Sequence, residues 1–256
     1  MNFRITSTLF IIITLGLIVF DQLNDIPAYI YFGFALIYSA LFFWGTIALS
    51  FQFFGPAKCK GESNSKSVAI TFDDGPEPEA THLVLTILKT ADAKATFFCI
   101  GKNVKDNPDL IRQIDSEGHL IGNHSFYHRS WFDLQPRRKM MTEIQNTNAI
   151  IAEATGKQPR FFRPPYGVIN PILASEIQKT RMVNVGWSVR SFDTVARDKN
   201  KLMERITKRL KGGDIILFHD RCKLTIEILP DLLMFITKSG LKVESLDKMI
   251  GEKAYV

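Results

Sequence analysis

Two adjacent carboxylates end an apolar run in the first third of the chain. Asp73 and Asp74 lie in AITFDDGPEP, residues 69–78, directly before a Gly-Pro turn. Two ionised carboxylates a few ångströms apart repel each other, so a protein that holds both needs a reason to do so. Asp and Gly are also ordinary turn residues after a strand. The pair alone therefore does not decide between a turn and a reactive site.

Two histidines, His124 and His128, lie four residues apart in HSFYH. If this segment forms a helical turn, both imidazoles lie on one side and can share a metal ion. Two histidines and one carboxylate, with open positions for water, form a common catalytic zinc arrangement. The histidine pair is weak evidence alone, and the aspartate pair strengthens it.

The elements that must position these residues alternate between strands and helices. Short apolar runs predict seven strands, at residues 67–72, 95–100, 120–122, 161–162, 182–187, 214–218 and 241–244. Helical spacing and cap signals predict helices between them, at 79–90, 108–118, 136–156, from 171 onward, 198–211 and 223–239, the last interrupted or restarted at Pro230. This pattern predicts an α/β fold whose parallel sheet closes into a barrel smaller than the usual eight-unit form.

The chemically interesting residues all follow the ends of predicted strands. In chain order these are Asp73 with Asp74, His124, RPPYG (163–167), the segment 187–193 and His219. Parallel barrels place their active sites at the carboxyl ends of their strands. We therefore expect these residues to meet in one site.

Five ordered motifs in this chain resemble those of the NodB-like polysaccharide deacetylases, carbohydrate esterase family four. The motifs are TFDDGP (71–76), HSFYH (124–128), RPPYG (163–167), WSVRSFD (187–193) and LFH (217–219). The resemblance covers about residues 67–250. It implies a deformed (β/α)7 barrel that hydrolyses the N-acetyl group of an amino sugar, with one divalent metal ion, usually zinc.

The resemblance also implies roles for single residues. It makes Asp74, His124 and His128 the metal ligands and Asp73 the general base, which takes a proton from the attacking water. The cation would neutralise one carboxylate and let its neighbour stay ionised, which would explain the aspartate pair.

Further roles carried by the resemblance concern the leaving group and the substrate. His219 matches the general acid, Asp193 the residue that orients or tunes it, and Arg163 the residue that orients the base. The backbone N–H of Tyr166 would receive the developing oxyanion, and Leu217 would line the pocket for the acetyl methyl group. Trp187 has two readings, a wall of the sugar site or a core residue.

The fourth motif departs from the family pattern at two positions. Thr194 follows Asp193 where many members have Trp, and Arg190 stands where Asp is frequent. Base, ligands and acid are intact, so we expect activity with an altered sugar groove. Other notable residues have plain structural readings: His82 and His119 as structural or solvated, Phe161 and Phe162 as core, and Asp220 as a turn residue.

The first 57 residues are strongly apolar. Residues 5–20 and 26–57 carry no charge, and about 20 apolar residues suffice to span a bilayer. We expect a membrane anchor of two helices, at about 5–23 and 28–54, then a linker at 58–66, the catalytic domain at 67–250 and a tail at 251–256. A secretory signal is the competing reading of the first stretch, which lacks a clear cleavage pattern.

The charges that flank the apolar stretches predict an orientation. Arg4 precedes them, Lys58, Lys60 and Lys66 follow them, and the turn at 21–27 has neither Lys nor Arg. The positive-inside rule then places both ends of the chain, and the catalytic domain, on the cytoplasmic face. The family habit of acting on wall polymers favours the outside instead.

The net charge of +6 fits a solvated helix face near a membrane better than a nucleic-acid site. Neither aromatic-interleaved basic motifs nor zinc-finger spacing is present. The three cysteines give no disulfide framework and no CxxC pair. The partners expected are an N-acetylated carbohydrate, which the resemblance implies, and a lipid bilayer, which the apolar stretches indicate; no nucleic acid is expected.

Two alternative functions remain open. The same site could cleave an O-acetyl ester. A catalytically silent carbohydrate-binding membrane protein would fit the fold, although it should lack a ligand, base or acid, and none is missing here.

Overall fold

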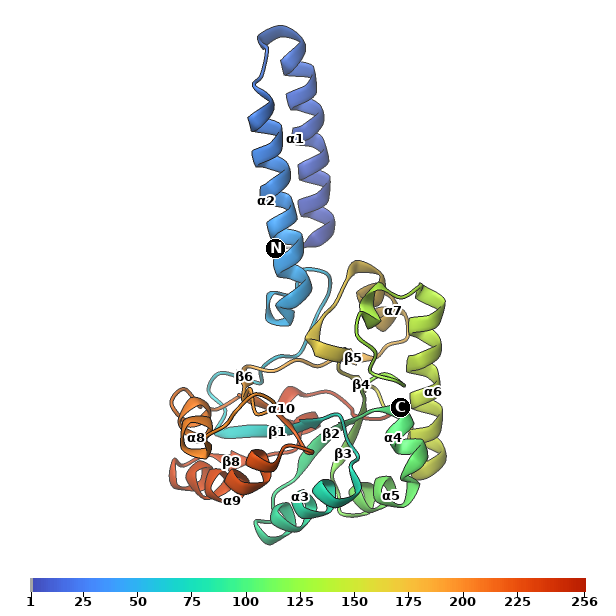
Figure 1. Ribbon diagram of the computed structural model, residues 1–256, viewed down its shortest axis with the longest axis vertical. Helices are drawn as coiled ribbons and strands as arrows, with labels where there is room; N and C mark the ends of the chain where they lie inside the picture. The colour runs from blue at the N-terminus through green and yellow to red at the C-terminus, as the bar shows by residue number, and fades with distance from the viewer. Residues whose placement is uncertain (1) are drawn as a thin grey trace.

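The computed structural model describes residues 2–256 and shows a helical hairpin on an α/β domain (Figure 1). Helix α1 (Phe3–Asn24) and helix α2 (Ala28–Ile47) lie side by side and project from the domain. Their apolar side chains face outward: α1 has no buried residue, and Gly45 is the buried residue of α2. Both helices are long and apolar enough to cross a membrane, and their exposure rules out a core role.

The second helix is shorter than the expected range of 28–54. After α2 ends, the 3-10 turn η1 (Leu49–Phe51) and the left-handed Gln52 (φ 51°) reverse the chain. Phe53 and Phe54 then pack back on the hairpin, with ring centroids 5.7 and 5.1 Å from that of Phe3. The sequence stays apolar after residue 47 although the helix has ended. The phenylalanine side chains there pack against the hairpin and do not extend α2.

The segments expected as a linker and a tail are packed parts of the domain. The Lys58 N–H donates to the Asn184 carbonyl at 2.8 Å, and the Gly61 N–H donates to the Gly213 carbonyl at 2.8 Å. At the other end, the Tyr255 hydroxyl accepts from the Ile121 N–H at 2.9 Å. Polar composition predicts mobility, but these backbone hydrogen bonds hold both segments on the barrel.

The sheet is parallel and curled, as expected for a deformed (β/α)7 barrel. Its strands are β1 (Ser67–Asp73), β2 (Ala95–Cys99), β3 (Leu120–Asn123), β4 (Phe161–Phe162), β5 (Val183–Asn184), β6 (Val189–Arg190), β7 (Ile215–His219) and β8 (Lys242–Val243). The order is β5-β4-β3-β2-β1-β7-β6, and β8 pairs with the start of β1. Strand β1 is thus central, and its carboxyl end lies between those of β2 and β7.

The strand expected at 182–187 is reduced to β5, and a second short strand that was not expected, β6, follows it on the opposite edge of the sheet. Strand β5 pairs with β4, whereas β6 pairs with β7. Between them the carbonyls of Val185 and Gly186 accept hydrogen bonds from the Arg163 guanidinium, at 3.2 and 2.9 Å. The hydrophobic pattern of residues 182–187 gives no sign of this contact with Arg163. The two hydrogen bonds hold the backbone outside the sheet.

Helices cover the outer face of the sheet. They are α3 (Pro78–Thr90), α4 (Gly101–Asp106), α5 (Pro108–Ser116), α6 (Arg137–Thr155), α7 (Pro171–Lys179), α8 (Lys199–Thr207), α9 (Lys223–Lys238) and α10 (Leu246–Ile250). The short helices α4 and α10 escape prediction because one or two turns carry little periodicity. Pro230 lies inside a continuous α9, and the Asn107 side chain makes no cap hydrogen bond to α5.

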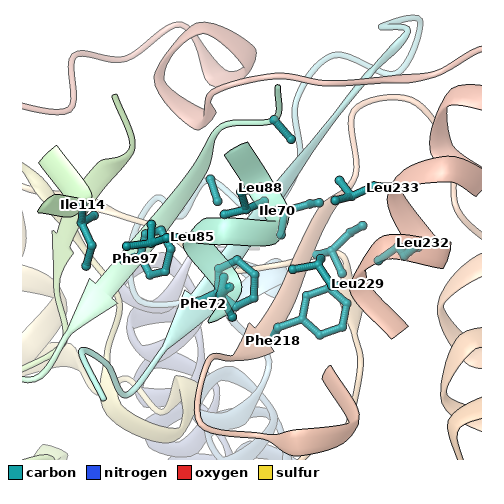
Figure 2. Packing of buried hydrophobic residues seen from close by; sticks show 14 of the residues in the cluster. Ile70, Phe72, Leu85, Leu88, Phe97, Ile114, Phe218, Leu229, Leu232 and Leu233 are labelled. Atoms are coloured by element: carbon teal, nitrogen blue, oxygen red, sulfur yellow. The ribbon is translucent and has the colours of Figure 1, made fainter. Parts of the chain in front are cut away.

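Alternation along β1 separates the core from the site. Val68, Ile70 and Phe72 face the helices, where Phe72 stacks on Phe97 and Phe218 with centroids 5.2 and 6.0 Å away. Figure 2 shows these rings against leucines of α3 and α9. Thr71 and Asp73 alternate with them, so they face the barrel interior. Because Val68, Ile70 and Phe72 pack against the helices, the Asp73 carboxylate must point into the barrel.

We expect Phe72→Ala to lower the free energy of unfolding by about 3–5 kcal/mol, because it removes a ring that is 1% exposed and leaves a cavity. Leu83→Ala on the same layer is the control, since Leu83 is 53% exposed and should change the free energy by about 0.5 kcal/mol or less. Urea unfolding in detergent measures both. Equal losses for the two variants would contradict this account of the core.

Candidate active site

The carboxyl ends of the strands surround a cavity of about 500 Å³, which we call the strand-end pocket. Its walls include most of the residues predicted from the sequence, namely Asp73, Asp74, His124, His128, Tyr166, Trp187, Leu217 and His219. Arg163 and Asp193 lie behind this wall and are buried. The structure therefore brings all ten predicted site residues to one place.

Arg163 holds Asp73 in position. Its Nη1 donates to Asp73 Oδ1 at 2.7 Å and to the Thr71 hydroxyl at 2.8 Å. Arg163 is fully buried and Asp73 is 3% exposed, so this ion pair has almost no solvent screening. A buried charge needs such a partner, and the pair leaves Asp73 Oδ2 directed toward His124, 3.8 Å from its Nε2.

The two histidines meet in a loop and not in the helical turn expected from their spacing. Ser125 and His128 both adopt left-handed backbone conformations, with φ of 62° and 50°. The Ser125 hydroxyl accepts the His128 N–H at 3.1 Å and stabilises this turn. The imidazole centroids of His124 and His128 are 4.7 Å apart, so the predicted proximity is correct although its local cause is different.

Asp74 completes a cluster that fits a divalent metal ion. Its Oδ1 lies 3.6 Å from His124 Nε2 and 3.5 Å from His128 Nε2. Three ligand atoms about 2.1 Å from a tetrahedral zinc ion are roughly 3.4 Å apart, which is close to these distances. The Asp74 backbone is left-handed, with φ of 75°, and this conformation turns the carboxylate out of the strand toward the histidines.

Two further observations support a cation at this cluster. Within residues 2–256, the buried Asp74 Oδ1 accepts no hydrogen bond. His124 Nδ1 lies 2.7 Å from the Arg163 carbonyl, so this nitrogen carries the proton and Nε2 presents a lone pair to Asp74. These three residues therefore offer one carboxylate and two imidazole ligands.

The pKa values of His128 and Asp74 also favour metal binding. Burial, followed by the neighbouring His124, lowers the pKa of His128 to about 4, so its imidazole is neutral near pH 7. Burial alone would raise the pKa of Asp74, but its interactions with the facing imidazoles, His124 first, and with Arg221 at the rim lower that pKa. Neutral imidazoles and an ionised carboxylate are the forms that bind metal.

His219 and Asp193 form a second hydrogen-bonded pair across the pocket. His219 Nδ1 donates to Asp193 Oδ1 at 2.8 Å, and Asp193 Oδ2 accepts from the His219 N–H and the Thr225 hydroxyl, both at 2.7 Å. Burial alone would lower the pKa of His219, but the hydrogen bond to Asp193 outweighs it and raises that pKa. His219 can therefore hold a proton on Nε2 for a group in the pocket.

Cys222 also lies near this pair, but the three residues are a poor metal site. Both Asp193 oxygens already accept hydrogen bonds, and burial raises the pKa of the Cys222 thiol to about 12. A protonated thiol does not ligate a metal well.

The predicted substrate-side residues form the remaining walls. Tyr166 has a left-handed φ of 58°, and its ring centroid is 4.7 Å from that of His128. Leu217 is 3% exposed on β7. Trp187 serves both of its expected uses, since it lines the pocket and packs against the core clusters. Gly167 is required next to Tyr166, because any Cβ there would overlap the Trp187 ring.

Several residues at the site carried no sequence signal. Arg221 is the main one: its Nη2 lies 3.0 Å from Asp74 Oδ2, while its side chain is 57% exposed at the rim. Thr71 and Thr225 supply hydroxyl groups to Arg163 and Asp193. These residues lie on separate elements, and only the fold brings them to their partners.

The two departures in the fourth motif lie at the pocket rim. Arg190 stacks on Phe192, with its guanidinium carbon 4.7 Å from the ring centroid, and lies 5.6 Å from the Trp187 centroid. Thr194 lines the pocket beside them. The rim is thus aromatic and cationic at the positions where the motif differs.

Asp220 lies in a turn directly after β7, as expected, but its side chain does not face the solvent. It is fully buried, and its Oδ2 accepts from the Thr81 hydroxyl at 2.5 Å. Burial raises the pKa of Asp220 to about 7. The other structural readings are confirmed: His82 is exposed, His119 is buried and accepts the Ala95 N–H, and Phe161 and Phe162 are fully buried.

Known proteins share this arrangement at the level of sequence and fold. The polysaccharide deacetylase family model matches residues 60–185. The chain is 33% identical over 201 residues to the peptidoglycan-N-acetylglucosamine deacetylase PgdA of Listeria monocytogenes, covering 78% of this chain and 42% of that protein. It thus spans about two fifths of the length of that relative.

A second relative is matched over most of its length. The peptidoglycan-N-acetylmuramic acid deacetylase PdaA of Bacillus subtilis is 32% identical over 197 residues, covering 75% of this chain and 74% of that protein. The crystal structure of the Bc1960 peptidoglycan N-acetylglucosamine deacetylase superposes with a TM-score of 0.74 at 28% identity, covering 77% and 93% of the two chains. With a shared sequence, a shared fold and five motifs that converge on one pocket, the chain belongs to the polysaccharide deacetylase family.

Proposed function

We propose that this protein is a membrane-anchored, metal-dependent carbohydrate deacetylase that hydrolyses the N-acetyl group of an amino sugar. One observation supports the proposal: the strand-end pocket combines three groups. These are a base held by a buried arginine, a cluster of one carboxylate and two imidazoles in which Asp74 Oδ1 accepts no hydrogen bond from the described residues, and a histidine paired with Asp193. The relatives act on N-acetylated peptidoglycan sugars according to their names, which supports the same reaction type here.

In this proposal Asp74, His124 and His128 hold one divalent cation, with zinc as our first choice. When bound, the cation polarises the acetamide carbonyl and lowers the pKa of a water molecule. Asp73 takes a proton from the attacking water, and the hydrogen bond from Arg163 orients that carboxylate.

The remaining steps fall to residues on the other walls. The backbone N–H of Tyr166 stabilises the negative charge that develops on the carbonyl oxygen, and Leu217 contacts the acetyl methyl group. His219 Nε2 gives its proton to the leaving nitrogen while Asp193 stabilises the imidazolium. The amide C–N bond breaks, and the products are acetate and a free amino sugar.

A carbohydrate O-acetyl esterase is the second candidate on the same site. An alkoxide leaves more easily than an amine anion, so ester cleavage depends less on His219. Comparing N-acetyl and O-acetyl substrates with His219→Ala separates the two: a smaller loss on the ester than on the amide is expected for this site. A silent carbohydrate-binding protein would release acetate from neither.

Two variants test whether Asp73 acts as the base and His124 as a metal ligand. We expect Asp73→Asn to keep zinc but to lose about 10²–10⁴-fold in turnover, because it removes the proton acceptor. His124→Ala should lose both zinc and turnover, because it removes one of three ligands.

Zinc content by mass spectrometry and acetate release from N-acetylglucosamine oligomers measure the two effects. Asp109→Asn, on the exposed start of α5, is the control. A metal-free Asp73→Asn protein would overturn the assigned roles.

A second prediction concerns pH. His219 must be protonated to act as an acid, so activity falls as the pH rises through its pKa. Asp193 raises this pKa. Asp193→Asn should therefore move the alkaline limb of the kcat/KM profile to lower pH. Asp198→Asn keeps an exposed helix cap and should leave the limb in place. An unchanged limb in Asp193→Asn would remove His219 from the acid role.

The orientation in the membrane is also a proposal. Arg4 and the lysines after residue 57 flank a turn without Lys or Arg, which supports a cytoplasmic catalytic domain. Alkaline phosphatase fused after Val256 should then be inactive, while a fluorescent protein fused there should fold and fluoresce. Phosphatase activity would place the domain outside, where the relatives' peptidoglycan substrates would be within reach.

A further inference from the structure

A second, apolar cavity of about 700 Å³ lies between the helical hairpin and the catalytic domain. We call it the hairpin groove. One wall comes from α2, with Phe42, Phe43 and Ile47, and the opposite wall comes from Trp131 and Leu134 of the segment after β3. Most of its surface is hydrocarbon, so it is suited to an apolar guest.

The groove has fixed walls. The Ile169 N–H donates to the Thr46 carbonyl at 3.0 Å, which ties the end of α2 to the loop after β4. Leu49, directly after α2, is 7% exposed and packs in a core cluster with Phe162 and Ile169. The hairpin therefore meets the domain in one defined position beside the strand-end pocket.

The groove and the strand-end pocket share a wall. Tyr166 lines both cavities, and its ring lies 4.7 Å from His128, one of the three expected metal ligands. Tyr166 therefore lies between the apolar groove and the end of the pocket that holds the three expected metal ligands. A sugar in the pocket can therefore direct a substituent into the groove without leaving the protein surface.

The groove lies where the bilayer surface would be. Its walls include residues of α2, a helix that could cross a membrane, and its other side exposes Trp131 and Leu134 by 74% and 68%. Exposed tryptophan and leucine are costly in water but favourable at a membrane interface. The basic residues Arg137 and Arg138 begin α6 three residues after Leu134, where they can contact anionic head groups.

We propose that the hairpin groove binds the hydrocarbon tail of a membrane glycolipid whose N-acetylated amino sugar occupies the strand-end pocket. The inference rests on the proposed function for the identity of the sugar. The tail remains in the bilayer, runs along α2 past Trp131 and Leu134, and reaches the pocket at Tyr166. A glycolipid, and not a wall polymer or a soluble oligosaccharide, is then the substrate class.

The test uses the full-length protein in nanodiscs and a series of alkyl β-glycosides of N-acetylglucosamine, from methyl to octyl. Each methylene that is fully buried gains about fourfold in binding. We expect kcat/KM for acetate release to rise at least about 30-fold from methyl to octyl, because several methylenes enter the groove. The octyl compound should also be a better substrate than N-acetylglucosamine tetramers.

A matched pair of variants separates the groove from general partitioning into the bilayer. Leu134→Ser should reduce the octyl-to-methyl ratio by about tenfold, because it places a hydroxyl group in the groove wall. Leu83→Ser removes another exposed leucine, on α3 and far from the groove (53% exposed, against 68% for Leu134), and should leave the ratio unchanged. Equal ratios in the two variants would overturn the proposal, as would a preference for the tetramers.

A binding measurement distinguishes failure of this inference from failure of the proposed function. An octyl glycoside with bromine at the chain end should quench the fluorescence of Trp131, measured as the difference between the parent protein and Trp131→Phe, because Trp44 and Trp187 emit in both. Quenching without acetate release would support the groove and defeat the deacetylase proposal. Acetate release that does not depend on chain length, with no quenching, would support the deacetylase proposal and defeat the groove.

Discussion

The buried guanidinium of Arg163 is the interaction on which the site depends. Its donors reach Asp73 and Thr71 on β1 and the carbonyls of Val185 and Gly186 beyond β5. Its own carbonyl accepts from His124. One residue thus orients the proposed base, orients one ligand and connects strands from two parts of the sheet. Removing it would leave a buried carboxylate without a partner, which costs several kcal/mol.

The same residue explains an irregularity of the fold. A guanidinium with five donors in the barrel interior must find acceptors there, and backbone carbonyls outside the sheet ladder are available acceptors. The chain between β5 and β6 supplies two of them and so leaves the sheet. The barrel is deformed at the place where the site needs a charge.

Much of the fold was predictable because it follows from local pattern. Short apolar runs gave the strands correctly at 67–72 and 95–100, and five motifs identified the residues that meet in the pocket. Arg221 and the buried state of Asp220 could not be predicted, because their partners, Asp74 and Thr81, lie 147 and 139 residues away in sequence. The end of α2 was missed because phenylalanine is equally apolar inside and outside a helix.

The packed state of residues 58–61 restricts where the proposed reaction can take place. A free linker of nine residues would let the domain move by about 16 Å relative to its anchor. Hydrogen bonds from Lys58 and Gly61 to the barrel, and from Ile169 to Thr46, remove that freedom. With the hairpin in a bilayer, the pocket would remain at one height and one tilt above the surface. Its encounters would be governed by lateral diffusion in two dimensions, so that the surface density of a substrate, and not its bulk concentration, would set the rate.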